Sequence, residues 1–316
     1  MSTIVFMFSG QGSQYYQMGG ELFEKHPPFR EVIYELDAIS HLIGGQSIIS
    51  HLYSENNRKI DIFDQTLHTH PAIFMVEYAL AQILLDRGIR PDYVLGTSIG
   101  EFASAALANV ISPEKALLAL IRQAETLESS CERGGMLAIL YDPSLYQETP
   151  LLRDNSELVS INFSLHFVIS GLSAPLQIIE EFLKERQINF QELPVTRAFH
   201  SSFIDPAAEV YLDFLNQRSY RPPQIPLMSC VQATVLDTIG KGYFWEVVRK
   251  PIRFREALKV LERRQDCLYL DLGPSGTLAN FVKYNLPEDS RSKSLAVMTP
   301  FGHDLKNLEK IESLFR

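Results

Sequence analysis

A serine between two glycines is the first feature of this sequence that could do chemistry. Residues 96–100 read G-T-S-I-G, with Ser98 at the centre. The apolar residues 93–95 favour a buried strand, and the alanine-rich residues 102–107 favour a helix. A serine at such a strand-to-helix turn is a nucleophile elbow, which presents its hydroxyl at a helix N-terminus. A glycine-rich turn whose serine has no catalytic role fits the same residues. The other motifs of the sequence must therefore distinguish the two interpretations.

A second glycine-rich turn follows the first predicted strand. Residues 3–8 favour a strand, and residues 9–14 read S-G-Q-G-S-Q. The turn lacks the order G-x-G-x-x-G and the lysine of a phosphate-binding loop, so we do not expect a nucleotide site. Its backbone N–H groups could instead face a ligand. Two later motifs complete the set, at residues 198–201 (A-F-H-S) and 273–275 (G-P-S).

Composition excludes several classes of function. The chain has 316 residues, 46% of them hydrophobic, and a net charge of −9, which is unlike a general nucleic-acid binder. Its three cysteines form no C-x-x-C pair and no histidines cluster at metal spacing, so we expect a reducing, cytoplasmic setting and no metal. No apolar run approaches the roughly 18 residues of a membrane span. Nothing calls for an oligomer, and we expect a monomer.

The order of predicted elements indicates an α/β protein with an inserted unit. Residues 1–131 and 197–316 are predicted to form the two parts of a large α/β-hydrolase-like domain with a parallel sheet. Residues 132–196 follow the order strand, helix or loop, strand, strand, helix, strand, which predicts a small ferredoxin-like α+β subdomain. A helix is predicted over residues 72–86, with His70 in a structural role beside its N-terminus.

The four motifs, in this order and spacing, resemble the acyl-carrier-protein acyltransferases of fatty acid and polyketide synthesis, the malonyl transacylase family. The resemblance covers essentially the whole chain. It implies that Ser98 takes up the acyl group as an ester and that His200 is its general base. It also implies an oxyanion hole made by the backbone N–H groups of Gln11 and Ile99. Backbone carbonyl groups orient the histidine in this family, so no third acidic residue is expected.

Two positions depart from the pattern of that family. Thr97 stands where the family usually has a histidine, so the pocket wall should differ in size and hydrogen bonding. Malonyl-selective members also carry an arginine on the helix after the elbow, which forms a bidentate pair with the free carboxylate. An ungapped count from Ser98 places Gln123 there. Arg122 would take its place only with a shift of one residue, which rotates a helical side chain by about 100°.

These departures favour an acyl hydrolase. A malonyl carboxylate buried without a cation would cost several kcal/mol, so acetyl and similar uncharged groups should be preferred in a pocket containing Gln123, Thr97 and Phe199. The sequence is similar to the free-standing acyl hydrolases of trans-acyltransferase polyketide synthases, which remove stalled acyl units from carrier proteins. Two alternatives stay open. One is a trans-acting acyltransferase, malonyl or other, that loads a carrier from CoA or another carrier, and the other is a docking protein with a decayed site.

The resemblance also implies an acidic acyl carrier protein as partner, which brings its own phosphopantetheine, so we expect no tightly bound cofactor. Residues 249–264 are unusually basic for an acidic chain and are opposed only by Glu256 and Glu262. We predict that part of this basic stretch docks the carrier, the alternative being a solvated helix face. Its cations are Arg249, Lys250, Arg253, Arg255, Lys259, Arg263 and Arg264.

Overall fold

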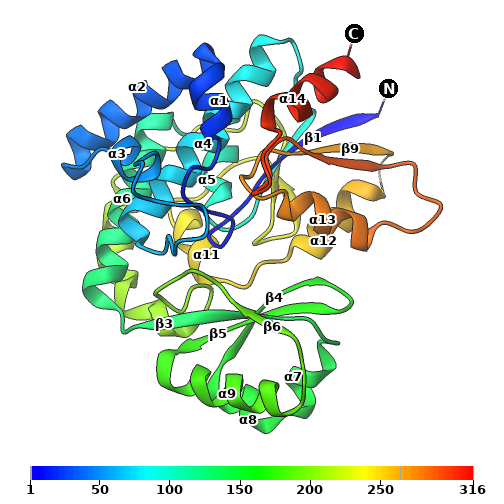
Figure 1. Ribbon diagram of the computed structural model, residues 1–316. Helices are drawn as coiled ribbons and strands as arrows, with labels where there is room; N and C mark the ends of the chain where they lie inside the picture. The colour runs from blue at the N-terminus through cyan, green and yellow to red at the C-terminus, as the bar shows by residue number, and fades with distance from the viewer. Residues whose placement is uncertain (1, 264, 316) are drawn as a thin grey trace.

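A six-stranded sheet forms the centre of the larger of two units. The computed structural model describes residues 2–263 and 265–315, and Figure 1 shows the large unit above a smaller one. The strand order is β10-β9-β1-β2-β7-β8, and only β8 runs antiparallel to its neighbour. The strands are β1 (Thr3–Phe8), β2 (Tyr93–Gly96), β7 (Leu227–Ser229), β8 (Thr234–Leu236), β9 (Cys267–Asp271) and β10 (Lys293–Ala296). The predicted α/β fold with a parallel core is confirmed.

Strand β1 is apolar from Ile4 to Phe8 because helices cover both faces of the sheet. Phe6 and Phe8 belong to the larger core cluster on one face. Val5 and Met7 point to the other face, where α12 (Phe254–Glu262) and α13 (Thr277–Asn285) pack. A strand buried on both faces needs no polar alternation, so the run of apolar residues in the sequence marks the middle of the sheet.

The remaining helices of the large unit pack mostly over the larger cluster. They are α1 (Gly20–Lys25), α2 (Pro27–Gly44), α3 (Ile48–Leu52), α4 (Thr66–Asp86), α5 (Gly100–Leu107), α6 (Pro113–Ser130), α10 (Ala208–Asn216), α11 (Tyr243–Arg249) and α14 (Asp304–Ser313), with a 3₁₀ turn η1 (Ser202–Ala207) before α10. Helix α4 begins at Thr66 and not at Ala72, so Pro71 lies within the helix. The prediction that His70 lies beside the N-terminus of this helix is wrong. His70 lies within α4, because the helix begins at Thr66 and its first turns are themselves packed in the core.

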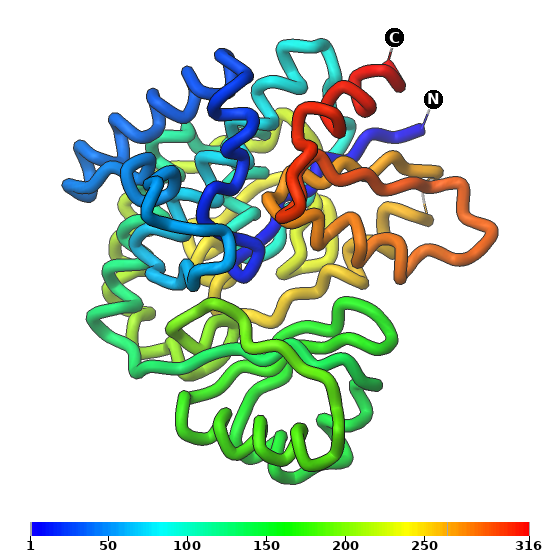
Figure 2. The backbone as a smooth tube through the Cα atoms, viewed as in Figure 1, coloured from blue at the N-terminus to red at the C-terminus, as the bar shows by residue number. Residues whose placement is uncertain are grey.

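The smaller unit is one continuous excursion of the chain, drawn in green in Figure 2. Its antiparallel sheet has the order β4-β5-β3-β6, which is the strand order of a ferredoxin-like unit. The strands are β3 (Gly134–Ile139), β4 (Glu157–Phe163), β5 (His166–Leu172) and β6 (Phe190–Glu192). Three helices, α7 (Ser144–Glu148), α8 (Pro150–Asn155) and α9 (Ser173–Glu185), cover the face turned away from the large unit (Figure 1).

The sheet face without helices is turned toward the large unit. Asn285 on α13 donates from Nδ2 to the carbonyl of Asn162 over 2.7 Å, and Ser160 forms a bridge with Ile252. Polar groups from both units therefore meet at this boundary. Within residues 2–263 and 265–315, no helix combines the length and apolarity that a membrane crossing needs, and no three histidine, cysteine or acidic side chains are grouped as metal ligands.

Candidate active site

The turn between β2 and α5 holds Ser98 in a left-handed backbone conformation, with φ of 53°. The flanking glycines make this turn possible because backbone atoms of other residues occupy the space that a side chain would need. A Cβ on Gly96 would lie 2.3 Å from the amide nitrogen of Glu101, and one on Gly100 would lie 2.2 Å from the carbonyl oxygen of Phe8. The G-x-S-x-G spacing is therefore a steric requirement of the turn.

His200 approaches Ser98 from a separate loop. The distance from His200 Nε2 to Ser98 Oγ is 2.9 Å, and His200 Nδ1 lies 2.9 Å from the carbonyl oxygen of Lys250. A carbonyl can only accept, so Nδ1 carries the proton and Nε2 presents its lone pair to the serine hydroxyl. Burial lowers the pKa of His200 to about 4, while the Lys250 carbonyl opposes that shift. The imidazole is thus a neutral base at pH 7.

The end of α11 fixes the position of this base. The backbone N–H of His200 donates to the carbonyl of Val248 over 2.8 Å, and the ring donates to Lys250 two residues later. Within the described residues, no carboxylate accepts a hydrogen bond from the ring. The backbone does the orienting that an aspartate does in a Ser-His-Asp triad.

The glycine-rich turn after β1 supplies backbone donors beside Ser98. Gln11 lines the same cavity as Ser98, and Ile99 directly precedes α5. Among the described residues, the N–H groups of Gln11 and Ile99 have no backbone or side-chain acceptor. The Gln11 side chain is tied down, since its Nε2 donates to Thr69 Oγ1 over 2.7 Å. Two unpaired, fixed donors of this kind suit a negative charge that develops next to Ser98.

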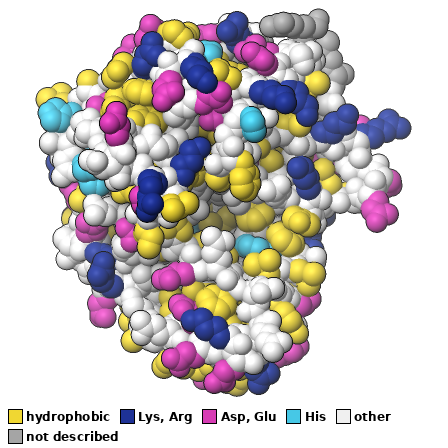
Figure 3. Space-filling model, viewed as in Figure 1, with side chains coloured by type: hydrophobic (Ala, Val, Ile, Leu, Met, Phe, Trp, Pro, Cys, Tyr) yellow, Lys and Arg dark blue, Asp and Glu magenta, His cyan; other side chains and the backbone are white. Residues whose placement is uncertain are grey.

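A cavity of about 590 Å³ opens between the two units and contains Ser98 and His200. Thr97 and Phe199 also line it, and Figure 3 shows hydrophobic side chains gathered along this boundary. Among the lining residues that the structure describes, Lys59 is the only lysine or arginine. The cavity can hold an extended, mostly uncharged ligand with its reacting carbon at Ser98.

Comparison with known proteins accounts for this arrangement. The model of the acyl transferase domain matches residues 5–314. The chain belongs to the acyl transferase domain family. It is 50% identical over 309 residues to the polyketide biosynthesis acyltransferase homolog PksD of Bacillus subtilis (strain 168), and to the same extent to the homolog BaeD of Bacillus velezensis, with 98% of this chain and 95% of each relative covered. The resemblance seen in the motifs is confirmed.

A solved structure extends the comparison to the fold. The malonyl CoA-acyl carrier protein transacylase from Clostridium perfringens superposes with a TM-score of 0.81 at 26% identity, covering 100% of this chain and 98% of that one. The match over the full length of both chains includes the inserted small unit.

The position that the family pattern gives to an arginine is filled here by a buried amide. Gln123 on α6 has no exposed surface, its Nε2 donates to Tyr211 Oη over 3.3 Å, and its Oε1 has no partner among the described residues. Gln123 does not line the cavity with Ser98, contrary to the placement expected from the sequence. It is buried between α6 and α10, where it contacts Tyr211.

Neither neighbouring arginine supplies the missing cation. Arg122 points to solvent, where it pairs with Glu125 at 2.6 Å. Arg197 is buried, but it donates to three backbone carbonyls, those of Leu127, Glu128 and Thr196, and so caps the end of α6. A shift of frame toward Arg122 therefore does not bring a guanidinium to the cavity.

Two buried carboxyl groups support the site, and the sequence analysis did not identify either of them. Glu77 on α4 accepts from the backbone N–H of Ser9 at 2.6 Å and from Ser9 Oγ at 2.8 Å. Glu101 on α5 accepts from the N–H of Cys230 at 2.9 Å and from the hydroxyl of Tyr243. Burial raises the pKa of Glu77 well above its usual range and that of Glu101 to about 8. Burial thus favours the neutral form of both side chains, which join Ser9 to α4 and Cys230 and Tyr243 to α5.

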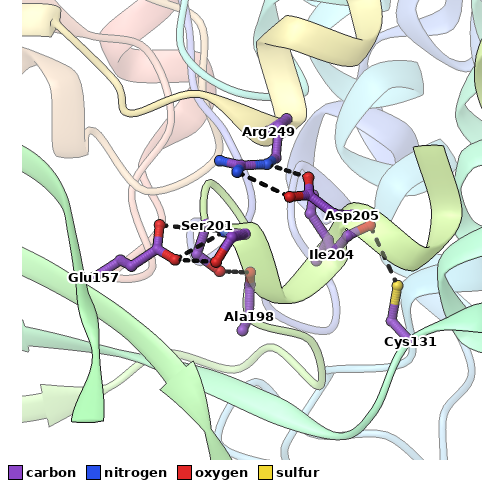
Figure 4. Close-up of polar contacts among 8 residues, drawn as sticks. Cys131, Glu157, Ala198, Ser201, Ile204, Asp205 and Arg249 are labelled. Atoms are coloured by element: carbon purple, nitrogen blue, oxygen red, sulfur yellow. Dashed lines mark hydrogen bonds and ion pairs between the residues drawn. The ribbon is translucent and has the colours of Figure 1, made fainter. Parts of the chain in front are cut away.

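The loop after His200 is fastened to both units, as Figure 4 shows. Ser202 donates its backbone N–H to the Glu157 carboxylate on β4 at 3.0 Å, and Arg249 pairs with Asp205. Arg249 is thus half-buried and paired with a carboxylate of its own chain, and docking of a carrier by the basic stretch stays a prediction. Arg264, also in that stretch, lies outside the described residues.

Proposed function

We propose that this protein is an acyl hydrolase of polyketide biosynthesis, which removes short uncharged acyl units from acyl carrier proteins. Family membership supports an enzyme of the acyltransferase type, and the 50% identical relatives are named for polyketide biosynthesis. The observation that carries the proposal is a Ser98–His200 pair, 2.9 Å apart, in a cavity with no arginine.

The geometry supports a two-step reaction. In the first step Ser98 Oγ attacks the thioester carbonyl, His200 Nε2 takes the hydroxyl proton, and the N–H groups of Gln11 and Ile99 stabilise the oxyanion. The intermediate expels the pantetheine thiolate, which takes the proton from His200. In the second step water attacks the Ser98 ester, His200 takes its proton and returns it to Ser98 Oγ, and the free acid leaves. The carrier's phosphopantetheine holds the substrate, and no step requires a cofactor of the protein's own.

Selectivity follows from charge. Among the described residues that line the cavity there is no arginine, because Arg122 is at the surface and Arg197 is committed to backbone carbonyls. The one lysine among them, Lys59, lies with Nζ 3.4 Å from the carbonyl oxygen of Pro300 and 5.6 Å from the centre of the Tyr15 ring, so a malonyl carboxylate would have no guanidinium to pair with. An unpaired buried charge costs several kcal/mol, whereas an acetyl group brings no such cost. Gln123 contributes to acyl selectivity because it is a neutral amide at the position where the family pattern has an arginine, and Thr97 and Phe199 shape the cavity wall.

The second candidate is a trans-acting acyltransferase, favoured by the structural match to a malonyl CoA-acyl carrier protein transacylase. Both functions share the Ser98 ester and differ only in whether water or a carrier thiol attacks it. A decayed docking protein is disfavoured, because it would have no use for a base placed 2.9 Å from the serine.

Intact mass spectrometry tests the proposal. Carrier proteins loaded with acetyl, butyryl or malonyl groups are incubated with the protein, with and without a second, free holo-carrier. We expect acetyl and butyryl to be lost to water, malonyl to stay on its carrier, and little label to reach the second carrier. Malonyl on the second carrier, or a lasting malonyl ester on Ser98, would refute the hydrolase and establish the transferase.

A further inference from the structure

A second, smaller cleft shares two lining elements with the cavity. It has a volume of about 320 Å³, and the residues that matter here are Ser164, Arg255, Lys259, Arg263, Tyr284 and Asn285. The same two elements line both spaces. Helix α13 contributes Phe281 to the cavity and Tyr284 to the cleft, and the β4–β5 hairpin contributes His166 to the cavity and Ser164 to the cleft.

The wall shared by the two spaces is held firmly in place. Phe163 stacks on Tyr284 with ring centroids 4.5 Å apart, and Asn285 donates to the carbonyl of Asn162 over 2.7 Å. These contacts join the hairpin of the small unit to α13 of the large unit. A substrate arm that runs from Ser98 in the cavity to the cleft therefore crosses an edge that is fixed by these contacts.

The cleft has an excess of positive charge. Within the part of the chain that the structure describes, Arg255, Lys259 and Arg263 form no ion pair. The Nε atom of Arg255 is buried and has no hydrogen-bond partner. One carboxylate, Glu262, also lines the cleft, but it already accepts from Tyr269 Oη at 2.7 Å and from Ser292 Oγ at 2.9 Å.

We propose that this cleft binds the phosphate of the carrier's phosphopantetheine arm. The inference rests on the proposed function, since it assumes that a pantetheine thioester occupies the cavity at Ser98. The arm of such a substrate ends in a phosphodiester, so an anion must lie outside the cavity mouth. A guanidinium and an ammonium group in a small concave site suit a compact tetrahedral anion. A buried, unpaired Arg255 Nε is the donor that such an anion would satisfy.

The experiment compares two substrates that differ only in the phosphate. KM is measured for acetyl-pantetheine and acetyl-4′-phosphopantetheine with the wild-type protein and with a triple variant, Arg255→Gln, Lys259→Gln and Arg263→Gln. Lys310→Gln, an exposed cation on α14, is the matched control. We expect the phosphate to lower the wild-type KM about tenfold, and this advantage to fall below about twofold in the triple variant and to persist in the control.

The outcomes separate this inference from the proposed function. An equal phosphate advantage in the wild type and the triple variant would overturn the phosphate site. A variant impaired only on whole carrier protein, with the phosphate advantage intact, would also overturn it and assign the cations to acidic residues of the carrier. If no thioester is hydrolysed, calorimetry of pantetheine and 4′-phosphopantetheine binding to Ser98→Ala protein gives the same comparison without the reaction. Melting temperatures check that the triple variant folds.

Discussion

Replacing Glu77 tests whether a buried carboxyl group far from the substrate positions the oxyanion hole. Its Oε1 accepts from both the backbone N–H and the Oγ of Ser9, two residues before Gln11. A Glu77→Leu change leaves the Ser9 N–H buried and unpaired, which costs about 1–3 kcal/mol, while Ser9 Oγ keeps Ser13 Oγ as a partner at 2.9 Å. If the turn relaxes, Gln11 N–H moves away from the oxyanion, and the loss of one such donor lowers kcat by about 10²–10³.

The glutamine variant provides the matched control. Burial raises the pKa of Glu77 well above its usual range, which favours the neutral acid, and Glu77→Gln is a neutral side chain of the same length that keeps an oxygen to accept from Ser9. We expect Glu77→Leu to lower kcat for an acetyl thioester at least tenfold with KM nearly unchanged, and Glu77→Gln to stay within about threefold of wild type. Equal kcat losses in the two variants, or a Glu77→Leu protein with wild-type kcat at a lowered melting temperature, would refute a positioning role.

Three further predictions follow from the site. Because burial lowers the pKa of His200 to about 4, protonation should abolish activity only as the pH falls through that value, and a kcat/KM profile with its acid limb near pH 6.5 would contradict the geometry. Gln123→Leu removes an orphaned oxygen outside the cavity, so acetyl hydrolysis should stay within about threefold and the free energy of unfolding within about 1 kcal/mol, as denaturant titration can check. Arg249→Ala breaks a partly exposed pair with Asp205, which should cost less than about 1 kcal/mol of stability yet lower kcat by loosening the His200 loop; unchanged kcat would count against that fastening.

The positions of the candidate site residues were predictable from the sequence because short motifs encode them locally. The glycines at 96 and 100 are needed for the turn itself, so their spacing marks Ser98. Helical phase also placed Arg122 and Gln123 on different faces of α6, as the structure shows. The helical period predicts which way a side chain points but not whether it reaches a cavity. The sequence therefore could not show that Gln123 does not line the cavity.

The supporting contacts were not predictable, because they join residues far apart in the chain. Glu77 bonds Ser9 across 68 residues, and Glu101 bonds Cys230 across 129. A glutamate in a helix gives no sign of such a partner, since the usual expectation is a solvated side chain. The same limit applies to residues 249–264, because a count of charges in the sequence could not show that Arg249 pairs with Asp205.

The backbone angles of the two reacting residues bear on how such a chain evolves. Ser98 and His200 both have positive φ, 53° and 63°, and a left-handed conformation costs a residue other than glycine about 1–3 kcal/mol. A gene released from selection for catalysis would gain stability by replacing either residue with glycine, which adopts these angles freely. Retention of a serine and a histidine at those two points is therefore what we expect if turnover depends on them.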